Sequence, residues 1–353
     1  MAACRKRPTL ARGDVPVQGR SRTNTEIALT VTSMLLETPN GRTMLIDGGG
    51  SNDDSAVDPR QVGLKTIVPF LHYRGINSLD LVVMTHPHSD HVGGLSEVLR
   101  EEKVGAVLDG DVLPYSTPSY NACRKAIRDK RIPYRHAIRG THLDFQDGVT
   151  VDVLNPPSPG AAYGTNPNND AMNNYSVVMR VTYGKTHFLL DGDAETEAES
   201  YIIAHEQDLT ADVLKCGHHG AGNASSDAWL DRVHPKFAAI SCGIRNHFGH
   251  PNPGTLARLQ AHGVQVFRTD HDGAAIFESD GTTVTAERTI QAHTNREFSV
   301  GVEGHPYREM IFRSAVTRVQ PCKYYLVQRS LFSIRVKDHS SSTAYSRGSI
   351  ARC

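Results

Sequence analysis

The sequence predicts an α/β protein built from alternating strands and helices. Three patterns indicate this class. Short apolar, β-branched runs have the length of buried strands, and the segments between them place apolar residues at helical spacing. Clusters of polar residues follow several strands, which is where layered α/β proteins assemble their sites. A hydrophobic content of 39% over 353 residues is sufficient for a globular core.

The N-terminal half begins with a predicted β-hairpin. Two strand-like runs flank Pro39-Asn40-Gly41, which is typical of a tight turn, and the second run ends in Asp47-Gly48-Gly49-Gly50. Three successive glycines indicate that the backbone approaches another part of the molecule closely. The predicted elements are strands 27–37 and 43–46, helix 60–73, strand 79–84, helix 92–102, strand 105–109, helix 118–130, and strands near 133–138 and 149–154.

The C-terminal half continues the alternation after a long loop. Residues 155–174 are rich in Pro, Gly and Asn, and long loops in compact domains are usually functional. A second hairpin turns at Gly184-Lys185. The predicted elements are strands 176–183 and 186–190, helix 194–206, strand 211–215, helix 226–233, strand 237–241, helix 253–262, and strands near 264–268, 274–278 and 282–286.

The segment Thr85–Gly94 holds the densest group of potential metal ligands. It follows a predicted buried strand and precedes a predicted helix. Close spacing in such a loop lets imidazole and carboxylate groups converge on one point, as borderline-soft divalent metals require. A lone histidine there would be read as a surface residue, but an H-x-H-x-D-H series before two glycines indicates metal binding. The candidate ligands are His86, His88, Asp90 and His91.

Three further polar clusters follow predicted strands. They are Asp191 and Asp193, then His218 and His219, then the loop residues Arg245, Asn246, His247 and His250. With the first series they supply enough ligands for two metals that share a carboxylate, and two ions about 3.5–4 Å apart can bind a bridging hydroxide. Asp191 is expected to cap the following helix instead, and His219 is as consistent with packing as with ligation.

The ordered series of motifs resembles the metallo-β-lactamase superfamily, and within it the hydrolase domain of ComEC-type DNA-uptake competence proteins. The likeness covers roughly 25–288 and implies a four-layer αββα sandwich whose H-x-H-x-D-H series lies between the layers. The matching segments are His86–Gly94, Asn173–Val178, Leu189–Asp193, Leu214–Gly220, Asn246–Pro251 and Arg268–Gly273.

The resemblance also implies roles for individual residues. His86 and His88 correspond to ligands of a first metal, Asp90, His91 and His218 to ligands of a second, and Asp193 to the carboxylate that bridges them. No histidine fills the superfamily's third position at the first metal, where Asn173-Asn174 lies instead. The predicted catalytic residues are Asp90, Asp193 and His250, and the predicted substrate-binding residues are Asn174, Ser176, Arg245 and Asn246.

These residues favour a dinuclear metal-dependent hydrolase, with a phosphodiesterase or nuclease as the first hypothesis. Its substrate would be a small-molecule or nucleic-acid phosphodiester. A hydrolase of β-lactams or lactones is the alternative, because the same two metals serve either reaction. A nucleic-acid-binding module with a degenerate site is a third hypothesis, disfavoured by the near-complete ligand set. Zn²⁺ is the favoured metal and Mn²⁺ the alternative.

Charge divides the chain into three parts. Residues 1–24 carry six Lys/Arg and one Asp, residues 289–353 carry ten Lys/Arg and four Asp/Glu, and the body between them holds 22 basic and 33 acidic residues. We expect a disordered basic segment at 1–24, the hydrolase domain at 25–288 and an irregular tail at 289–353. Scattered cysteines, the lack of a secretory signal and the lack of an integral membrane segment predict a cytoplasmic protein.

Overall fold

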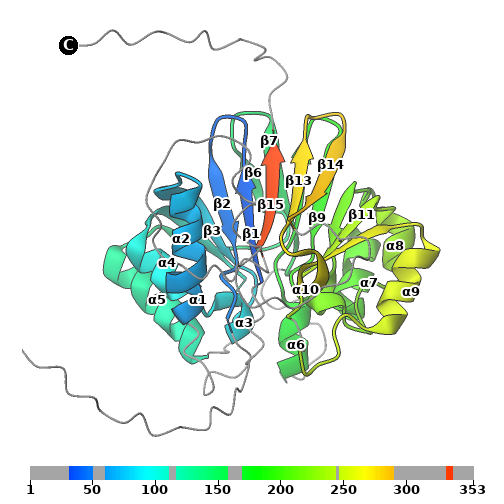
Figure 1. The fold of residues 1–353 in the computed structure, drawn as a ribbon, viewed down its shortest axis with the longest axis horizontal. Coiled ribbons are helices and arrows are strands. Elements are labelled where there is room, and N and C mark those ends of the chain that lie inside the picture. Colours follow the sequence, from blue (N-terminus) through cyan, green and yellow to red (C-terminus); the bar gives the residue numbers. More distant parts are fainter. Residues whose placement is uncertain are drawn as a thin grey trace, which may run out of the picture.

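Two packed β-sheets with helices on their outer faces form the protein, as Figure 1 shows. The computed structural model describes residues 32–50, 60–110, 117–157, 169–243, 246–289 and 331–336. Among these residues the first sheet has eight strands and the second has seven. The predicted four-layer αββα sandwich is therefore confirmed.

The first sheet has the strand order β14-β13-β15-β1-β2-β3-β4-β5. Within it β1 and β2 form the predicted antiparallel hairpin, while β2, β3, β4 and β5 run parallel. The strands are β1 (Ser33–Glu37), β2 (Thr43–Ile46), β3 (Ser78–Met84), β4 (Lys103–Asp109), β5 (Tyr134–His136), β13 (Ala275–Ser279), β14 (Val284–Arg288) and β15 (Leu331–Val336).

The second sheet has the order β12-β11-β10-β9-β8-β7-β6. It is antiparallel from β6 to β9 and parallel from β9 to β12. Sequence patterning did not predict β6. The strands are β6 (His142–Asp144), β7 (Val149–Asn155), β8 (Val178–Tyr183), β9 (Thr186–Leu190), β10 (Val213–Lys215), β11 (Phe237–Ile240) and β12 (Gln265–Arg268).

Helices cover the outer face of each sheet (Figure 1). The predicted helix 60–73 is continuous but contains a π-helical turn. On the first sheet lie α1 (Arg60–Val62), η1 (Gly63–Ile67), α2 (Val68–Tyr73), α4 (Leu95–Glu101) and α5 (Pro118–Lys130), with α3 (Ser89–Val92) beside them. The other helices are α6 (Asn169–Asn174), α7 (Thr196–His205), η2 (Gly217–Gly220), α8 (Asp227–Val233), α9 (Pro253–Ala261) and α10 (Thr269–Asp272). Within the described part of the chain, none combines the length and apolarity needed to cross a membrane.

Alternate residues of a strand enter different core layers, because successive side chains point to opposite faces. In β3, Leu81 and Val83 pack between the sheets, whereas Val82 and Met84 pack under the helices. Both faces of the first sheet are thus buried, which explains why this strand reads as a continuous apolar run. A third layer lies between the second sheet and its helices and contains the fully buried Trp229.

Strand β15 departs from the prediction of an irregular tail at 289–353. Most of that segment lies outside the described residues, but Leu331–Val336 pairs in parallel with both β1 and β13. Ile334 and Val336 are 3% and 5% exposed and join the core between the sheets. These six residues therefore belong to the folded domain. Residues 1–24 lie outside the described part, so their predicted disorder stays a prediction.

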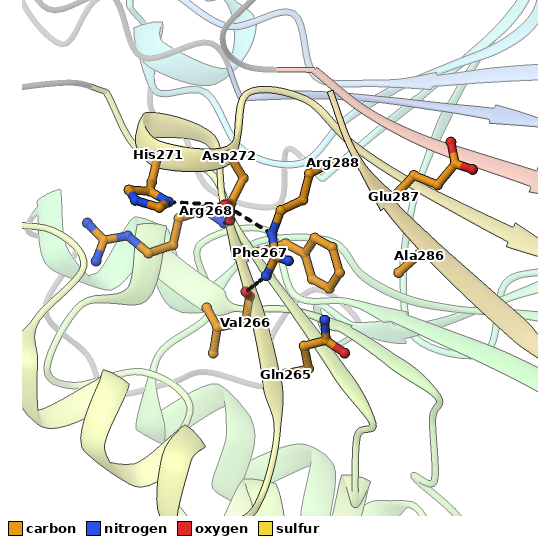
Figure 2. A pocket seen from close by; sticks show the side chains of 9 residues that line it. All are labelled: Gln265, Val266, Phe267, Arg268, His271, Asp272, Ala286, Glu287 and Arg288. Atoms are coloured by element: carbon orange, nitrogen blue, oxygen red, sulfur yellow. Dashed lines mark hydrogen bonds and ion pairs between the residues drawn. The ribbon is translucent and has the colours of Figure 1, made fainter. Parts of the chain in front are cut away.

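A groove of about 820 Å³ opens where the edge strands β12 and β14 approach each other (Figure 2). Arg288 is held in this groove: its Nε lies 3.0 Å from Asp272 Oδ1, and its terminal nitrogen donates to the carbonyl of Val266. None of the predicted metal ligands lines the groove, so we assign it no role in substrate binding. Its lining residues are Gln265, Val266, Phe267, Arg268, His271, Asp272, Ala286, Glu287 and Arg288.

Candidate metal centre

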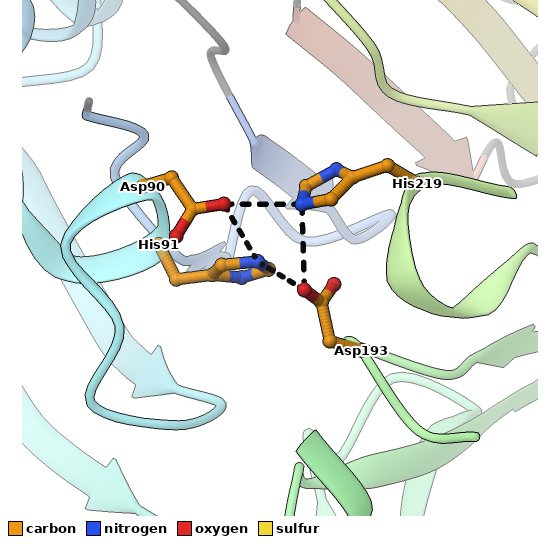
Figure 3. A group of neighbouring side chains, drawn as sticks. All are labelled: Asp90, His91, Asp193 and His219. Atoms are coloured by element: carbon orange, nitrogen blue, oxygen red, sulfur yellow. Dashed lines mark hydrogen bonds and ion pairs between the residues drawn. The ribbon is translucent and has the colours of Figure 1, made fainter. Parts of the chain in front are cut away.

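Four buried side chains converge where the two halves of the sandwich meet (Figure 3). Asp90 and His91 lie on α3, directly after β3 of the first sheet. Asp193 follows β9, and His219 lies in η2 after β10, both in the second sheet. Each half of the sandwich thus supplies one imidazole and one carboxylate.

Contact between two glycine runs holds the helix that carries Asp90 and His91. Gly48 N donates to the carbonyl of His91, and Gly94 N donates to that of Gly49. A Cβ on Gly94 would lie 2.3 Å from the carbonyl oxygen of Gly48, so no larger residue fits there. The close approach predicted from the Gly48–Gly50 run is to this backbone. The predicted helix 92–102 corresponds to α4, which begins at Leu95, and the short helix α3 precedes it.

The spacing of the four ligand atoms fits one tetrahedral ion. His219 Nε2 lies 3.1 Å from Asp90 Oδ2 and 3.3 Å from Asp193 Oδ2. His91 Nε2 lies 3.1 Å from Asp193 Oδ2 and 3.8 Å from Asp90 Oδ2. Ligands about 2.1 Å from a tetrahedral ion are about 3.4 Å apart, which is within this range. Asp193 Oδ1 is also buried without a hydrogen-bond partner among the described residues, as expected of a ligand atom.

His86 and His88 form a second group of donors beside the first. His86 Nε2 lies 3.1 Å from His88 Nδ1 and 3.9 Å from Asp193 Oδ2. This spacing places the Asp193 carboxylate between the two groups, where one carboxylate can serve two ions. His86, His88 and Asp193 would supply three ligands to a first ion, and a catalytic ion held by three protein ligands would take water or substrate as its fourth.

Acceptor groups orient the imidazoles toward the cluster. His91 Nδ1 donates to Asp47 Oδ2 at 2.7 Å, and His219 Nδ1 donates to the carbonyl of Ser241 at 2.9 Å. Because Nδ1 holds the proton in each ring, Nε2 is the atom available to a metal. Asp47 also accepts from the backbone and hydroxyl of Thr85. Because the Thr85 hydroxyl donates its one hydrogen bond to Asp47, its oxygen is an acceptor for His86 Nδ1, which lies 3.1 Å away.

Sequence reasoning missed Asp47. The side chain is fully buried, and its backbone is left-handed at φ 58°. The available signal was an acidic residue at the end of a strand, directly before three glycines. Metal-binding histidines regularly donate their second nitrogen to such a carboxylate, and that partner fixes the orientation of the ring.

The electrostatics of the cluster couple its acids to its histidines. Burial alone would raise the pKa of Asp193, but the charges of His219 and His91 hold it well below its usual range. Burial would conversely lower the pKa of His219, yet Asp193 and Asp90 raise it to about 9. At His86, burial and the neighbouring His91 lower the pKa well below its usual value, so that ring is neutral. A cation can therefore replace the protons on His91 and His219.

His219, and not the predicted His218, takes part in the four-residue cluster. Both backbones are left-handed, at φ 41° and 54°, and the two side chains point to different partners. His218 Nδ1 lies 2.8 Å from Glu195 Oε1, which also accepts from Asn173 Nδ2 at 2.8 Å. The structure thus assigns His218 a carboxylate partner beside the cluster. Left-handed conformations of this kind are costly outside glycine and concentrate at functional sites.

Asn174 and Ser176, predicted to bind substrate, are buried and engaged elsewhere. Asn174 is 3% exposed, and its Oδ1 accepts from the backbone nitrogens of Glu195 and Ala198 at the start of α7. Ser176 is fully buried, and its Oγ accepts from the backbone nitrogen of Asp193 and lies 3.3 Å from His86 Nδ1. Both side chains position the loop that bears Asp193, which is a supporting role.

The loop Asn246–His250 approaches the cluster from the second sheet. Asn246 Nδ2 donates to the carbonyl of His250, and its Oδ1 accepts from the backbone nitrogen of His250. This amide braces the loop, and the predicted phosphate contact would compete with those bonds. The His250 ring lies 6.3 Å from that of His219. Burial and the neighbouring His218 and His219 lower the pKa of His250 to about 4. Arg245 lies outside the described residues.

Asp191 does not cap α7 through its side chain. It is 1% exposed, and its Oδ2 accepts from Trp229 Nε1 at 2.9 Å. Burial and the charge of Glu199 raise its pKa well above its usual range. Asp191 thus lies outside the cluster.

The sandwich and the His/Asp cluster together define the architecture of a metal-dependent hydrolase. The profile of the Metallo-beta-lactamase superfamily matches residues 27–244, and the chain belongs to that superfamily. ComE operon protein 3 of Bacillus subtilis (strain 168) is 32% identical over 251 residues, which cover 68% of this chain and 31% of that protein. Competence protein ComA of Neisseria gonorrhoeae is 31% identical over 258 residues, covering 72% of this chain and 32% of that protein.

These relatives confirm the predicted likeness to ComEC-type competence proteins, although the chain spans about a third of their length. Among solved structures, an isothiocyanate hydrolase from Delia radicum gut bacteria superposes with a TM-score of 0.42 at 14% identity, over 68% of this chain and 94% of that chain.

Proposed function

We propose that this protein is a dinuclear metal-dependent phosphodiesterase that acts on nucleic-acid strands. The observation that carries the proposal is the position of Asp193, whose carboxylate lies within 3.3 Å of two imidazoles on one side and 3.9 Å from His86 on the other. Phosphodiester cleavage builds charge on two oxygens of the phosphate, and a pair of cations offsets charge at both. The competence proteins among its relatives point to DNA as the polymer.

The residues present fit two divalent ions. Asp90, His91, Asp193 and His219 would hold one, and His86, His88 and Asp193 the other. Bound ions would supply Lewis-acid activation of water and stabilisation of phosphate charge. Imidazole with carboxylate favours Zn²⁺, and Mn²⁺ is the alternative.

The protein's own groups prepare the site before substrate arrives. Asp47 and the carbonyl of Ser241 hold their imidazoles in one orientation, and Ser176 fixes the backbone of Asp193. His250 is half-buried beside His219 and is neutral at pH 7, because its pKa is about 4. We assign it the role of a hydrogen-bond donor to a phosphate oxygen, where one preorganised donor contributes about 10²–10³ in turnover.

A hydrolysis panel tests the proposal. Protein loaded with Zn²⁺ or Mn²⁺ is offered single-stranded DNA, an activated phosphodiester, a β-lactam and a lactone. We expect cleavage of the two phosphodiesters and slow or absent ring opening. Efficient hydrolysis of the β-lactam or lactone without phosphodiester cleavage would contradict the proposed substrate class and favour the alternative hydrolase.

His250→Ala is a second test of the same site. It should lower phosphodiester turnover by about 10²-fold, a common scale for one donor, and leave metal content unchanged. Full turnover in this variant would show that His250 does not contact the substrate.

A further inference from the structure

Phe248 presents an aromatic ring to solvent beside the metal cluster. Among the described residues, three large apolar side chains are exposed: Leu64 at 42%, Tyr73 at 65% and Phe248 at 61%. Leu64 and Tyr73 lie on the helices that cover the first sheet. Phe248 lies on the loop that also carries His250. An exposed aromatic residue at the rim of a site is a candidate contact for ligand.

Its ring belongs to a series that leads to the cluster. The rings of Phe248 and His250 are 6.0 Å apart between centroids and inclined by 15°. Those of His250 and His219 are 6.3 Å apart and inclined by 23°. Each ring in the series is thus inclined by a small angle to the next, and His219 is one of the four clustered residues. A flat group stacked on Phe248 would lie at the solvent-exposed end of this series.

The loop is braced, so the ring has a defined position. Asn246 bonds to both the nitrogen and the carbonyl of His250, and also donates to the carbonyl of Gly243. Just beyond it, Asn252 N donates to the carbonyl of Gly220, next to His219. These bonds tie the Phe248 turn to the segment that carries the metal ligand, and a preorganised contact loses less entropy on binding.

We propose that Phe248 is a stacking platform for a nucleobase next to the scissile phosphate, and that the preferred substrate is therefore single-stranded. This inference rests on the proposed phosphodiesterase function. A base inside a duplex is stacked on both neighbours, so only an unpaired base offers its face to Phe248. Phenylalanine has no hydrogen-bonding group, so the platform accepts any base and gives little sequence preference.

The test compares two strands with one cleavable linkage each. Both are oligothymidylates in which methylphosphonates replace all other linkages, and in one the nucleotides flanking the cleavable phosphate are abasic. Stacking of one base is worth about 1–3 kcal/mol, or roughly 5- to 150-fold. We expect the wild-type protein to cleave the strand with bases at least 5-fold more efficiently, by kcat/KM, than the abasic strand.

Phe248→Ala should reduce this preference to near one, and Phe248→Trp should retain it. Tyr73→Ala is the matched control, because it removes an equally exposed aromatic ring elsewhere and should keep the wild-type ratio. An unchanged ratio in Phe248→Ala would overturn the platform. Cleavage of neither strand by metal-loaded wild-type protein would instead contradict the proposed function.

A binding measurement tests the platform without turnover. A strand whose linkages are all methylphosphonates carries 2-aminopurine, a base whose fluorescence falls on stacking. Quenching by the wild-type protein and by Phe248→Trp, but not by Phe248→Ala, supports the platform. Equal quenching by all three proteins, or by none, overturns it.

Discussion

Two kinds of side chain build the metal cluster. Some supply the candidate ligand atoms, and others hold those ligands in position. Asp90, His91, Asp193 and His219 meet within ligand distance, whereas Asp47 and Ser176 act on their rings and backbones. Residues close in sequence have different roles. Asp193 and His219 belong to the cluster, whereas the nearby Asp191 accepts from Trp229 and His218 pairs with Glu195. Substitutions at adjacent positions should therefore have very different effects.

Asp193→Asn should reduce turnover by more than about 100-fold, beyond the 10–100-fold cost of losing an orienting partner. Asp191→Asn should keep most of the activity. Burial and Glu199 raise the pKa of Asp191, so asparagine replaces a largely neutral group and still accepts from Trp229. Steady-state kinetics on an activated phosphodiester compares the two variants. Similar losses would show that the bridging carboxylate is misassigned.

His219→Ala should lower the metal content from about two ions per chain toward one, because it removes a ligand of the second site. His218→Ala is its matched control, since both positions have left-handed backbones and alanine is equally strained at each. His218→Ala should bind as much metal as wild-type protein. Elemental analysis after dialysis measures the metal content of the two variants. Metal loss in His218→Ala alone would show that His218, and not His219, is the ligand.

The metal-free protein should lose stability as pH rises from about 6.5 to about 9. Asp193 and Asp90 raise the folded-state pKa of His219 to about 9, above its value near 6.5 in the unfolded chain. A raised histidine pKa stabilises the fold fully below the unfolded value, and this contribution is lost through the folded value. Urea unfolding in the presence of a chelator measures this loss of stability as a function of pH.

Metal affinity should rise over the same pH range, because the histidine ligands must be deprotonated to bind an ion. If the stability of the metal-free protein instead rose between pH 6.5 and 9, the proposed ion pairs of His219 with Asp193 and Asp90 would be wrong.

At the scale of elements, the H-x-H-x-D-H loop, the two hairpins and the strand–helix alternation were predictable, because each has a local pattern. The presence of His219 rather than His218 in the buried cluster was not, because it depends on two successive left-handed backbone conformations, which are uncommon outside glycine. The role of Asn174 depended on the backbone nitrogens of Glu195 and Ala198, which only the fold brings close. The bonds of Asn246 to His250 are local, but no sequence motif that we used predicts them. Strand β15 had a weak local signal, alternation over Phe332–Val336, while its partners β1 and β13 are distant in sequence.

Ile334→Ala should reduce the free energy of unfolding by about 2–5 kcal/mol, the usual cost of removing a large aliphatic side chain from a core. Ile334 is 3% exposed between the sheets. Arg335→Ala, at the next position, should cost at most about 1 kcal/mol, because its ion pair with Glu278 is partly solvated. Denaturant unfolding of the two variants measures this difference. Equal free energies of unfolding for Ile334→Ala and Arg335→Ala would show that Ile334 does not pack in the core.

At the scale of the whole molecule, the cluster joins the two halves of the sandwich. The first sheet contributes Asp90 and His91 and the second contributes Asp193 and His219 (Figure 3). A bound ion therefore connects the halves, and ligand binding to the native state adds its free energy to the fold. The αββα architecture was predictable from the motif series, but the inclusion of β15 in the first sheet extends the folded domain beyond the predicted boundary at residue 288.

We propose that two metal ions held by this protein hydrolyse phosphodiesters. Metal content and cleavage of an activated phosphodiester can be measured on the same protein sample, before chelation, after chelation and after stepwise return of Zn²⁺ or Mn²⁺. We expect about two ions per chain, loss of cleavage with their removal, and recovery that is complete at two equivalents. Metal-free protein that still cleaves the phosphodiester at the original rate would show that the cluster is not a catalytic metal centre.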